Sequence, residues 1–152
     1  MLFPIIHRII ENDKYLTEIH SFYKAAEGEK DMFRVIIAGC RDFFDYDVVR
    51  DYADKMLAAI EDDIQIVSGH ASGVDKLGER YARERGYDVA LYPAEWNKYG
   101  AAAGPKRNRE MAANADALIA YWDGSSRGTK NMIEEAKAKG LKVRIKYVNE
   151  NK

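Results

Sequence analysis

The sequence predicts an α/β fold: an open, mostly parallel, doubly wound sheet of five strands with helices on both faces. Three observations predict it. From residue 34 onward, short apolar runs rich in β-branched residues alternate with longer amphipathic segments. Several short runs are apolar without strict alternation, which is typical of strands covered on both faces. The connections between the runs are long enough for right-handed β-α-β crossovers.

Each of the five apolar runs has about the usual length of a strand and is rich in valine, isoleucine, alanine or tyrosine. In chain order, we expect the strands at Arg34–Ala38, Ile64–Ser68, Asp88–Tyr92, Ala117–Tyr121 and Leu141–Tyr147.

Four helices are expected between these strands, because apolar residues there recur at spacings of three and four. Asp45 or Asp47 is a candidate N-cap of the first helix, and Gly86 and Gly140 are typical stops after the second and fourth. Pro105 suits the first turn of the third helix. The expected helices are Val48–Ile60, Val74–Arg85, Pro105–Asn114 and Thr129–Lys139.

Residues 1–32 lie outside this alternation and are expected to form a helical extension with a linker, leaving 33–152 as the α/β domain. Apolar residues in the extension fit one or two amphipathic helices, and residues 25–31 resemble a linker. We expect the extension to pack on the sheet or on a second subunit, which would make a homodimer. Its polar interruptions fit neither a signal peptide nor a membrane span, so a cytoplasmic location without membrane contact is expected.

The composition limits the function classes. The chain has 24 basic and 25 acidic residues, so there is no bulk electrostatic reason to expect nonspecific nucleic-acid binding. Cys40 is the single cysteine, and the three histidines do not stand at metal-ligand spacing. We therefore expect no disulfide and no metal site.

The unusual residues fall in the loops that follow the strands. In an open α/β sheet, ligands bind beyond the carboxyl ends of the strands, where these loops meet. Glycine lets backbone amides approach an anion, a helix N-terminus adds its positive dipole end, and arginine pairs with phosphate. Any one loop could be a plain turn, but together they favour an anion-binding cleft. The loops are residues 39–43, 68–75, 93–96 with 103–108, and 122–129.

Familiar phosphate motifs are absent from these loops. The first contains only Gly39, so it lacks the G-x-G-x-x-G dinucleotide fingerprint, and no G-K-S or G-K-T of a Walker A loop occurs. Cys40 is interpreted as a small apolar filler rather than a nucleophile, and His70 as a polar loop residue. Asp75 either charges the start of a helix or binds a ribose. Trp96, Tyr99 and Trp122 either pack or stack on a base.

Taken in order, the loops resemble the SLOG superfamily, a Rossmann-like group, and specifically its YspA-like branch. The resemblance covers about residues 33–147, and the second loop is also similar to the glycine loop of the DNA-processing protein A family. It implies a nucleotide-derived ligand at this rim, often in a phage or mobile-element context. The runs that carry it are AGCRDF (38–43), SGHASGVD (68–75), PAEW (93–96), AGPKRNREM (103–111) and DGSSRGTKNMI (123–133).

The residues expected to bind a nucleotide, by this resemblance and the loop chemistry, come from all the loops. No cofactor is expected besides such a ligand. The expected set is Gly39, Arg41, Ser68, Gly69, Gly73, Asp75, Trp96, Arg107, Asn108, Gly124, Arg127, Gly128 and Thr129.

The better-characterised relatives in that superfamily are the LOG-type phosphoribohydrolases, which cleave the base from a nucleoside monophosphate. Their catalytic arginine corresponds to Arg107, so the resemblance makes Arg107 the candidate catalytic residue. Their catalytic glutamate corresponds to Asn131, and a neutral amide cannot act as the base. Glu134 and Glu135 lie about one helical turn away and are not obvious substitutes.

Three hypotheses follow. The favoured one is a module that binds or senses a nucleotide or an ADP-ribose-like derivative without turning it over. The second is a nucleotide hydrolase of the phosphoribohydrolase type, in which Asp75, Glu95 or Asp123 replaces the missing glutamate. The third is a single-stranded DNA binder, suggested by the shared second loop and by cations such as Arg41 and Arg109 but opposed by the balanced net charge.

Overall fold

The computed structural model describes residues 18–19, 22–23, 26 and 31–149. The chain divides into two compact units, Met1–Asp31 and Met32–Lys152. In the first unit, the described residues 18–19, 22–23 and 26 have helical backbone. The remainder of the predicted helical extension lies outside the described residues.

The second unit contains a five-stranded sheet in which every neighbouring pair is parallel, with the order β3-β2-β1-β4-β5. Its strands are β1 (Met32–Gly39), β2 (Asp63–Ser68), β3 (Asp88–Leu91), β4 (Ala117–Trp122) and β5 (Lys142–Tyr147). From β1 the chain builds outward through β2 to β3, and it then returns to place β4 on the other side of β1. The strand order therefore reverses between β1 and β4, where open α/β sheets bind their ligands.

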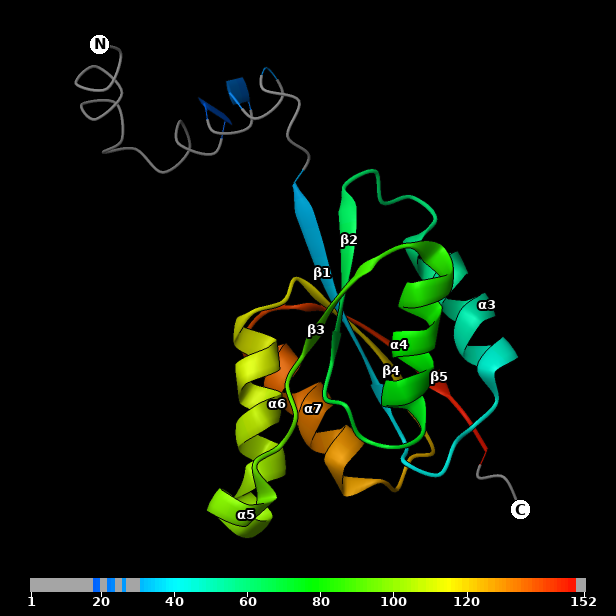
Figure 1. Ribbon diagram of the computed structural model, residues 1–152, viewed down its shortest axis with the longest axis vertical. Helices are drawn as coiled ribbons and strands as arrows, with labels where there is room; N and C mark the ends of the chain where they lie inside the picture. Colours follow the sequence, from blue (N-terminus) through cyan, green and yellow to red (C-terminus); the bar gives the residue numbers. More distant parts are fainter. Residues whose placement is uncertain (1–17, 20–21, 24–25, 27–30, 150–152) are drawn as a thin grey trace, which may run out of the picture. The chain divides into compact units, whose positions relative to one another are not determined.

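Helices cover both faces of this sheet (Figure 1). One core packs β1, β2 and β4 against α3 (Tyr46–Leu57) and α4 (Val74–Arg85). The other packs the opposite face against α6 (Ala103–Ala113) and α7 (Arg127–Ala138). Successive residues of β1 face opposite cores: Val35 and Ile37 belong to the first, Ile36 and Ala38 to the second.

The predicted fold class and all five strands are confirmed, with boundaries shifted by no more than two residues. The Asp45 side chain caps α3 by accepting a hydrogen bond from the backbone N–H of Val48 at 3.4 Å. Gly86 ends α4 in the left-handed conformation, as expected. The sequence did not predict α5 (Trp96–Tyr99) or the 3-10 turn η1 (Gly100–Ala102), and α6 begins two residues before Pro105. Such short turns contain no full period of apolar residues to read.

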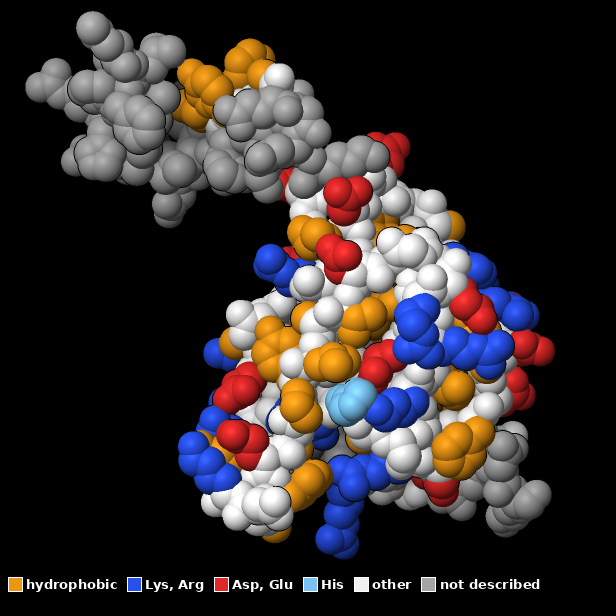
Figure 2. Space-filling model, viewed as in Figure 1, with side chains coloured by type: hydrophobic (Ala, Val, Ile, Leu, Met, Phe, Trp, Pro, Cys, Tyr) orange, Lys and Arg blue, Asp and Glu red, His pale blue; other side chains and the backbone are white. Residues whose placement is uncertain are grey.

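The surface mixes both signs of charge. Figure 2 shows acidic and basic side chains interspersed over α3 and α4, while apolar side chains gather over the edge strand β3. Val89 and Leu91 of that strand are exposed. Among the described residues, none of the helices combines the length and apolar character that crossing a membrane requires.

Candidate functional site

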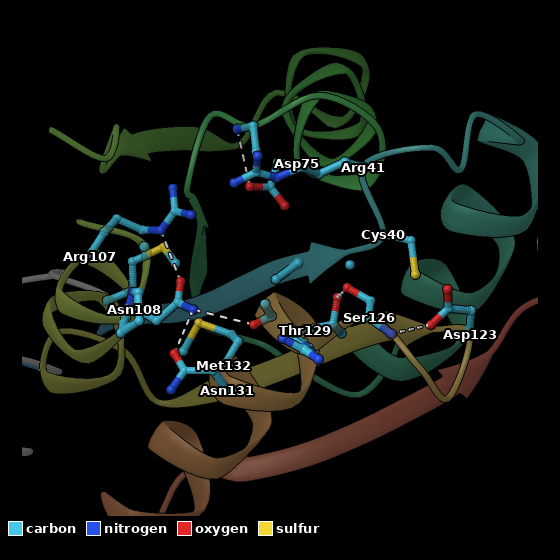
Figure 3. A pocket seen from close by; sticks show the side chains of 18 of the residues that line it. Cys40, Arg41, Asp75, Arg107, Asn108, Asp123, Ser126, Thr129, Asn131 and Met132 are labelled. Carbon is cyan, nitrogen blue, oxygen red and sulfur yellow. Dashed lines mark hydrogen bonds between the residues drawn. The ribbon is translucent and has the colours of Figure 1, made fainter. Parts of the chain in front are cut away.

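A cavity of about 700 Å³ opens at the carboxyl ends of the strands, where the strand order reverses. Its walls come from the end of β1, the start of α4, α5, the first turns of α6 and the loop that leads into α7. Its size lies in the range of small-molecule and cofactor sites. Figure 3 shows Arg107, Asn108 and Asn131 on one side of it and Cys40 and Asp123 on the other.

Backbone hydrogen bonds tie the first loop to its neighbours. The N–H of Cys40 donates to the carbonyl of Tyr121 at 3.2 Å, and the N–H of Val74 donates to the carbonyl of Cys40 at 3.1 Å. Gly73 has a φ of +77°, and a Cβ at this position would collide with the Cys40 carbonyl. Gly73 is therefore a structural requirement of the loop junction. The junction fixes the backbone of residues 39–42 at the cavity wall.

Cys40 itself behaves as the predicted filler. Its side chain is buried, and its Sγ lies 3.6 Å from the carbonyl of Tyr121. Burial raises the pKa of the Cys40 thiol above its ordinary value. A buried thiol with a raised pKa is a poor nucleophile, because the reactive form is the thiolate.

Asp75 contributes a buried carboxyl group to the cavity wall. One of its oxygens accepts a hydrogen bond from the N–H of Ala71 at 3.2 Å, within the loop that precedes α4. Burial is the main cause that raises the pKa of Asp75 to about 6, and the positive charge of Arg107 opposes this rise. The carboxyl group therefore changes its charge near neutral pH, as groups in functional sites commonly do.

Arg107 reaches the same wall from α6 but is held by protein groups. Its Nη1 donates to the carbonyl of Gly69 at 2.5 Å and lies 3.4 Å from that of Tyr92, and its Nε donates to Oδ1 of Asn108 at 2.9 Å. Burial lowers the pKa of Arg107, and the nearby Asp75 carboxylate counteracts this. A Cβ on Gly69 would lie 2.6 Å from Nη1, so only glycine permits this approach. Arg107 thus joins the β2 loop to α6.

A chain of amides continues from Arg107 toward α7. Asn108 accepts from Arg107 and donates through Nδ2 to Oδ1 of Asn131 at 2.9 Å. Asn131 lines the cavity at the position where the LOG-type resemblance would place a glutamate. Its amide oxygen accepts this hydrogen bond from Asn108, which orients the uncharged Asn131 side chain at the cavity wall.

The loop before α7 presents the start of that helix to the cavity. Both Ser125 and Ser126 donate their backbone N–H to Oδ1 of Asp123, at 2.8 and 2.7 Å. Ser126 is the N-cap residue, but its side chain makes no capping hydrogen bond to the backbone of the first turn. The first amides of a helix have no intrahelical acceptor. This turn, including Gly128 and the buried Thr129, therefore offers donors to an anion.

The structure brings most of the expected binding residues to the cavity wall. Four of them do not line the cavity: Ser68, Gly69, Gly73 and Gly124. Ser68 is fully buried and donates to Glu79 at 2.9 Å, while Gly69 and Gly73 serve the close approaches described above. Gly124 supplies a turn with a φ of +86°. The expected residues that line the cavity are Gly39, Arg41, Asp75, Trp96, Arg107, Asn108, Arg127, Gly128 and Thr129.

Sequence reasoning missed the partner of His70. Its Nδ1 lies 3.0 Å from the buried carboxylate of Glu79, which also accepts from Ser68. His70 has a left-handed backbone with a φ of +59°. The pairing joins residues nine apart across a turn, so no sequence period indicated it. Sequence reasoning also left Ser125 and Ser126 out of the expected set, although serines before a helix are a typical N-cap signal.

Known proteins resemble this chain in sequence and in fold. The model of the YspA, cpYpsA-related SLOG family matches residues 33–99. The Gene 61 protein of Mycobacterium phage D29 is 36% identical over 118 residues, which cover 74% of this chain and 94% of that protein.

Among solved structures, DNA processing protein A from Streptococcus pneumoniae superposes with a TM-score of 0.56 at 21% identity. The match covers 75% of this chain but only 50% of that one, and at this identity it shows a shared fold. The family match spans β1 to α5, and the phage relative matches this chain over most of the length of both proteins. The chain therefore belongs to the YspA, cpYpsA-related SLOG family.

Proposed function

We propose that this protein binds a nucleotide or a nucleotide derivative, such as an ADP-ribose-type compound, in the cavity without turning it over. The observation that carries the proposal is the meeting of arginines with the amino end of α7 in one cavity at the reversal of strand order. Such an arrangement favours a phosphate. Membership of the SLOG family, which suggests nucleotide-related binding or processing, supports the same ligand class.

The proposal of binding without turnover rests on Asn131. Cleavage of a glycosidic bond requires a carboxylate to activate water or to stabilise positive charge at the sugar. Asn131 has an amide at the position of the expected glutamate, and Asn108 occupies its oxygen. A ligand held there meets a hydrogen-bonding group rather than a base.

Titration calorimetry with AMP and ADP-ribose tests the proposal. Arg127 stands in the first turn of α7 and lines the cavity, so Arg127→Ala should weaken binding about tenfold through the loss of a charge-assisted contact. Lys130→Ala removes an exposed cation from the same helix outside the cavity lining and should leave the affinity unchanged. Equal effects of the two substitutions, or no binding of either compound to the wild type, would contradict the proposal.

A second candidate function, nucleotide hydrolysis, is favoured by Asp75 alone. A buried carboxyl group with a pKa of about 6 on a cavity wall suits general acid or base chemistry near neutral pH. Hydrolysis of a nucleoside monophosphate would consume one water and release the free base and ribose 5-phosphate. Chromatography should then detect both products with the wild type and neither with Asp75→Asn. Intact substrate after long incubation would contradict this candidate.

A further inference from the structure

Trp96 forms an exposed aromatic platform at the cavity. The residue lines the cavity, and 46% of its surface is exposed although tryptophan is generally well buried. It begins the short helix α5, which directly follows the loop after β3. An aromatic ring left open to solvent at the wall of the cavity offers a face on which a flat group can stack.

Gly104 fixes the position of this platform. A Cβ on Gly104 would lie 3.2 Å from Cη2 of the Trp96 indole, so the first turn of α6 packs directly against the ring. Gly104 has no positive φ and stands in the first turn of α6. A side chain at this position would make the indole move by a few tenths of an ångström, so glycine lets α6 and the ring lie in direct contact.

Arg41 covers the Trp96 ring from the first loop. Its Cζ lies 5.3 Å from the ring centroid. The backbone of Arg41 is fixed, because its carbonyl accepts a hydrogen bond from the Ser72 hydroxyl at 3.1 Å, whereas its side chain is exposed. A flat ring inserted between the two would need stacking distances of about 3.5 Å on each side. An outward movement of the guanidinium by about 2 Å would provide that room.

We propose that Trp96 and Arg41 form a clamp for the base of the ligand, with Gly104 seating the tryptophan. This inference rests on the proposed function, because it places the base of the same nucleotide whose phosphate binds at α7. Both a tryptophan ring and a guanidinium stack on the flat face of a base, which every base possesses. The clamp therefore requires a base but does not discriminate between bases. It favours nucleotides over phosphosugars, which lack a base.

The test compares AMP and ADP-ribose with ribose 5-phosphate by titration calorimetry. Removing one stacking partner of a base typically weakens binding about 5- to 150-fold. Trp96→Ala should weaken the binding of AMP and ADP-ribose by that factor and leave the affinity for ribose 5-phosphate within about twofold of the wild-type value. Trp96→Phe should restore part of the affinity. Tyr99→Leu, which removes a ring of α5 outside the cavity lining, should change nothing.

Fluorescence supplies a second readout. The chain has two tryptophans, so Trp122→Phe leaves Trp96 as the only tryptophan, whose emission is excited selectively at wavelengths that tyrosine does not absorb. In that variant, AMP should quench the emission, and ribose 5-phosphate should not. Unchanged AMP affinity in Trp96→Ala, or an equal loss for AMP and ribose 5-phosphate, would overturn the clamp while leaving the proposed function in place. If none of the three compounds binds to the wild type, the proposed function itself fails and the clamp fails with it.

Discussion

At the residue scale, Asp75 lies in the cavity wall, and its burial makes the charged carboxylate unfavourable for the stability of the fold. Asp75 is 5% exposed, and Arg107 lies near its carboxyl group without forming one of the close ion pairs found elsewhere in the described domain. Burial without such a pair penalises the charged form. A residue that is costly to ionise and that borders a cavity is more simply explained by ligand binding than by folding.

The cost at Asp75 predicts a distinct pH dependence of stability. Because the pKa of Asp75 is raised to about 6 in the folded state, the folded protein holds this proton more tightly than the unfolded chain does. The contribution of Asp75 to the free energy of unfolding should therefore be largest below about pH 4. It should fall by roughly 3 kcal/mol as the pH rises through 6.

Asp75→Asn removes this titration, so wild type and variant should diverge between pH 4 and pH 7. Urea unfolding at several pH values measures the difference, and the variant should gain stability relative to the wild type as the pH increases. The gain should come with weaker nucleotide binding if the carboxylate contacts the ligand. A difference that does not vary with pH would show that Asp75 ionises normally in the folded protein.

Two glycines with a positive φ should respond differently to alanine. Gly73 and Gly86 have φ values of +77° and +72° but ψ values of −129° and +27°, and an added Cβ meets the Cys40 carbonyl at Gly73 and open space at Gly86. Gly86→Ala should cost about 1 kcal/mol, the penalty of a left-handed alanine. Gly73→Ala should cost clearly more, on the order of 3 kcal/mol, because the loop junction must also move. Thermal unfolding of both variants checks the ranking, and equal losses would contradict it.

The sequence predicted which residue types stand at the rim but not how they are used. Arg107 could be placed in the cavity loops from its position, yet its bonds to the Gly69 and Tyr92 carbonyls depend on how α6 meets the β2 loop. The His70–Glu79 pair depends in the same way on the left-handed backbone at His70. Contacts between segments that approach only in the folded chain leave no local period in the sequence.

At the element scale, a polar network joins α3 to α4, between the buried Tyr81 and the partly exposed Asp54 and Arg85. Asp54 of α3 accepts hydrogen bonds from the Tyr81 hydroxyl at 2.7 Å and from Arg85 at 2.6 and 3.0 Å. The hydrogen bond from Arg85 is the largest influence that lowers the pKa of Asp54. The contribution of this carboxylate to stability is therefore present above its ordinary pKa of about 3.8 and is lost as the pH falls through the lowered value.

Asp54→Ala should destabilise the protein by about 1 kcal/mol at pH 7, mainly because the otherwise buried Tyr81 loses its acceptor. Asp47→Ala on the same helix removes an exposed ion pair with Arg50 and should change stability by less than about 0.5 kcal/mol. The difference between the two variants should shrink as the pH falls through the lowered pKa of Asp54, where its carboxyl group becomes protonated. Denaturant unfolding at pH 7 and at a series of acidic pH values measures this, and a constant difference would exclude the carboxylate charge as its source.

The elements themselves were largely predictable because their apolar periods are local. The four long helices and five strands contain enough residues to show a period of 3.6 or a continuous apolar run. The turns α5 and η1 do not, and they lie between the expected strand Asp88–Tyr92 and the expected helix Pro105–Asn114. That omission matters for function, because α5 contains Trp96 and directs the chain toward α6. The short helix α5, which contributes most to the proposed base site, was therefore the element that could not be predicted from the sequence.

At the scale of the whole molecule, the strand order explains why one cavity collects residues from so many loops. The reversal between β1 and β4 parts the loops that follow these strands, and α6 and α7 close the space on one face of the sheet. The sequence predicted the parallel sheet and the rim from the alternation of elements. It did not predict the strand order, which follows from pairings between distant segments.

Every residue that lines the cavity lies between Ala38 and Met132, within the compact unit that begins at Met32. A chain shortened to residues 32–152 should therefore unfold in one cooperative transition and bind nucleotides with the affinity of the full chain, within about twofold.

If residues 1–31 provide a dimer contact, light scattering after gel filtration should show a dimer for the full chain and a monomer for the shortened one. A shortened chain that folds but no longer binds nucleotides would mean that the extension contributes to the site. A shortened chain that fails to fold would show that the α/β unit depends on residues 1–31 of the full chain.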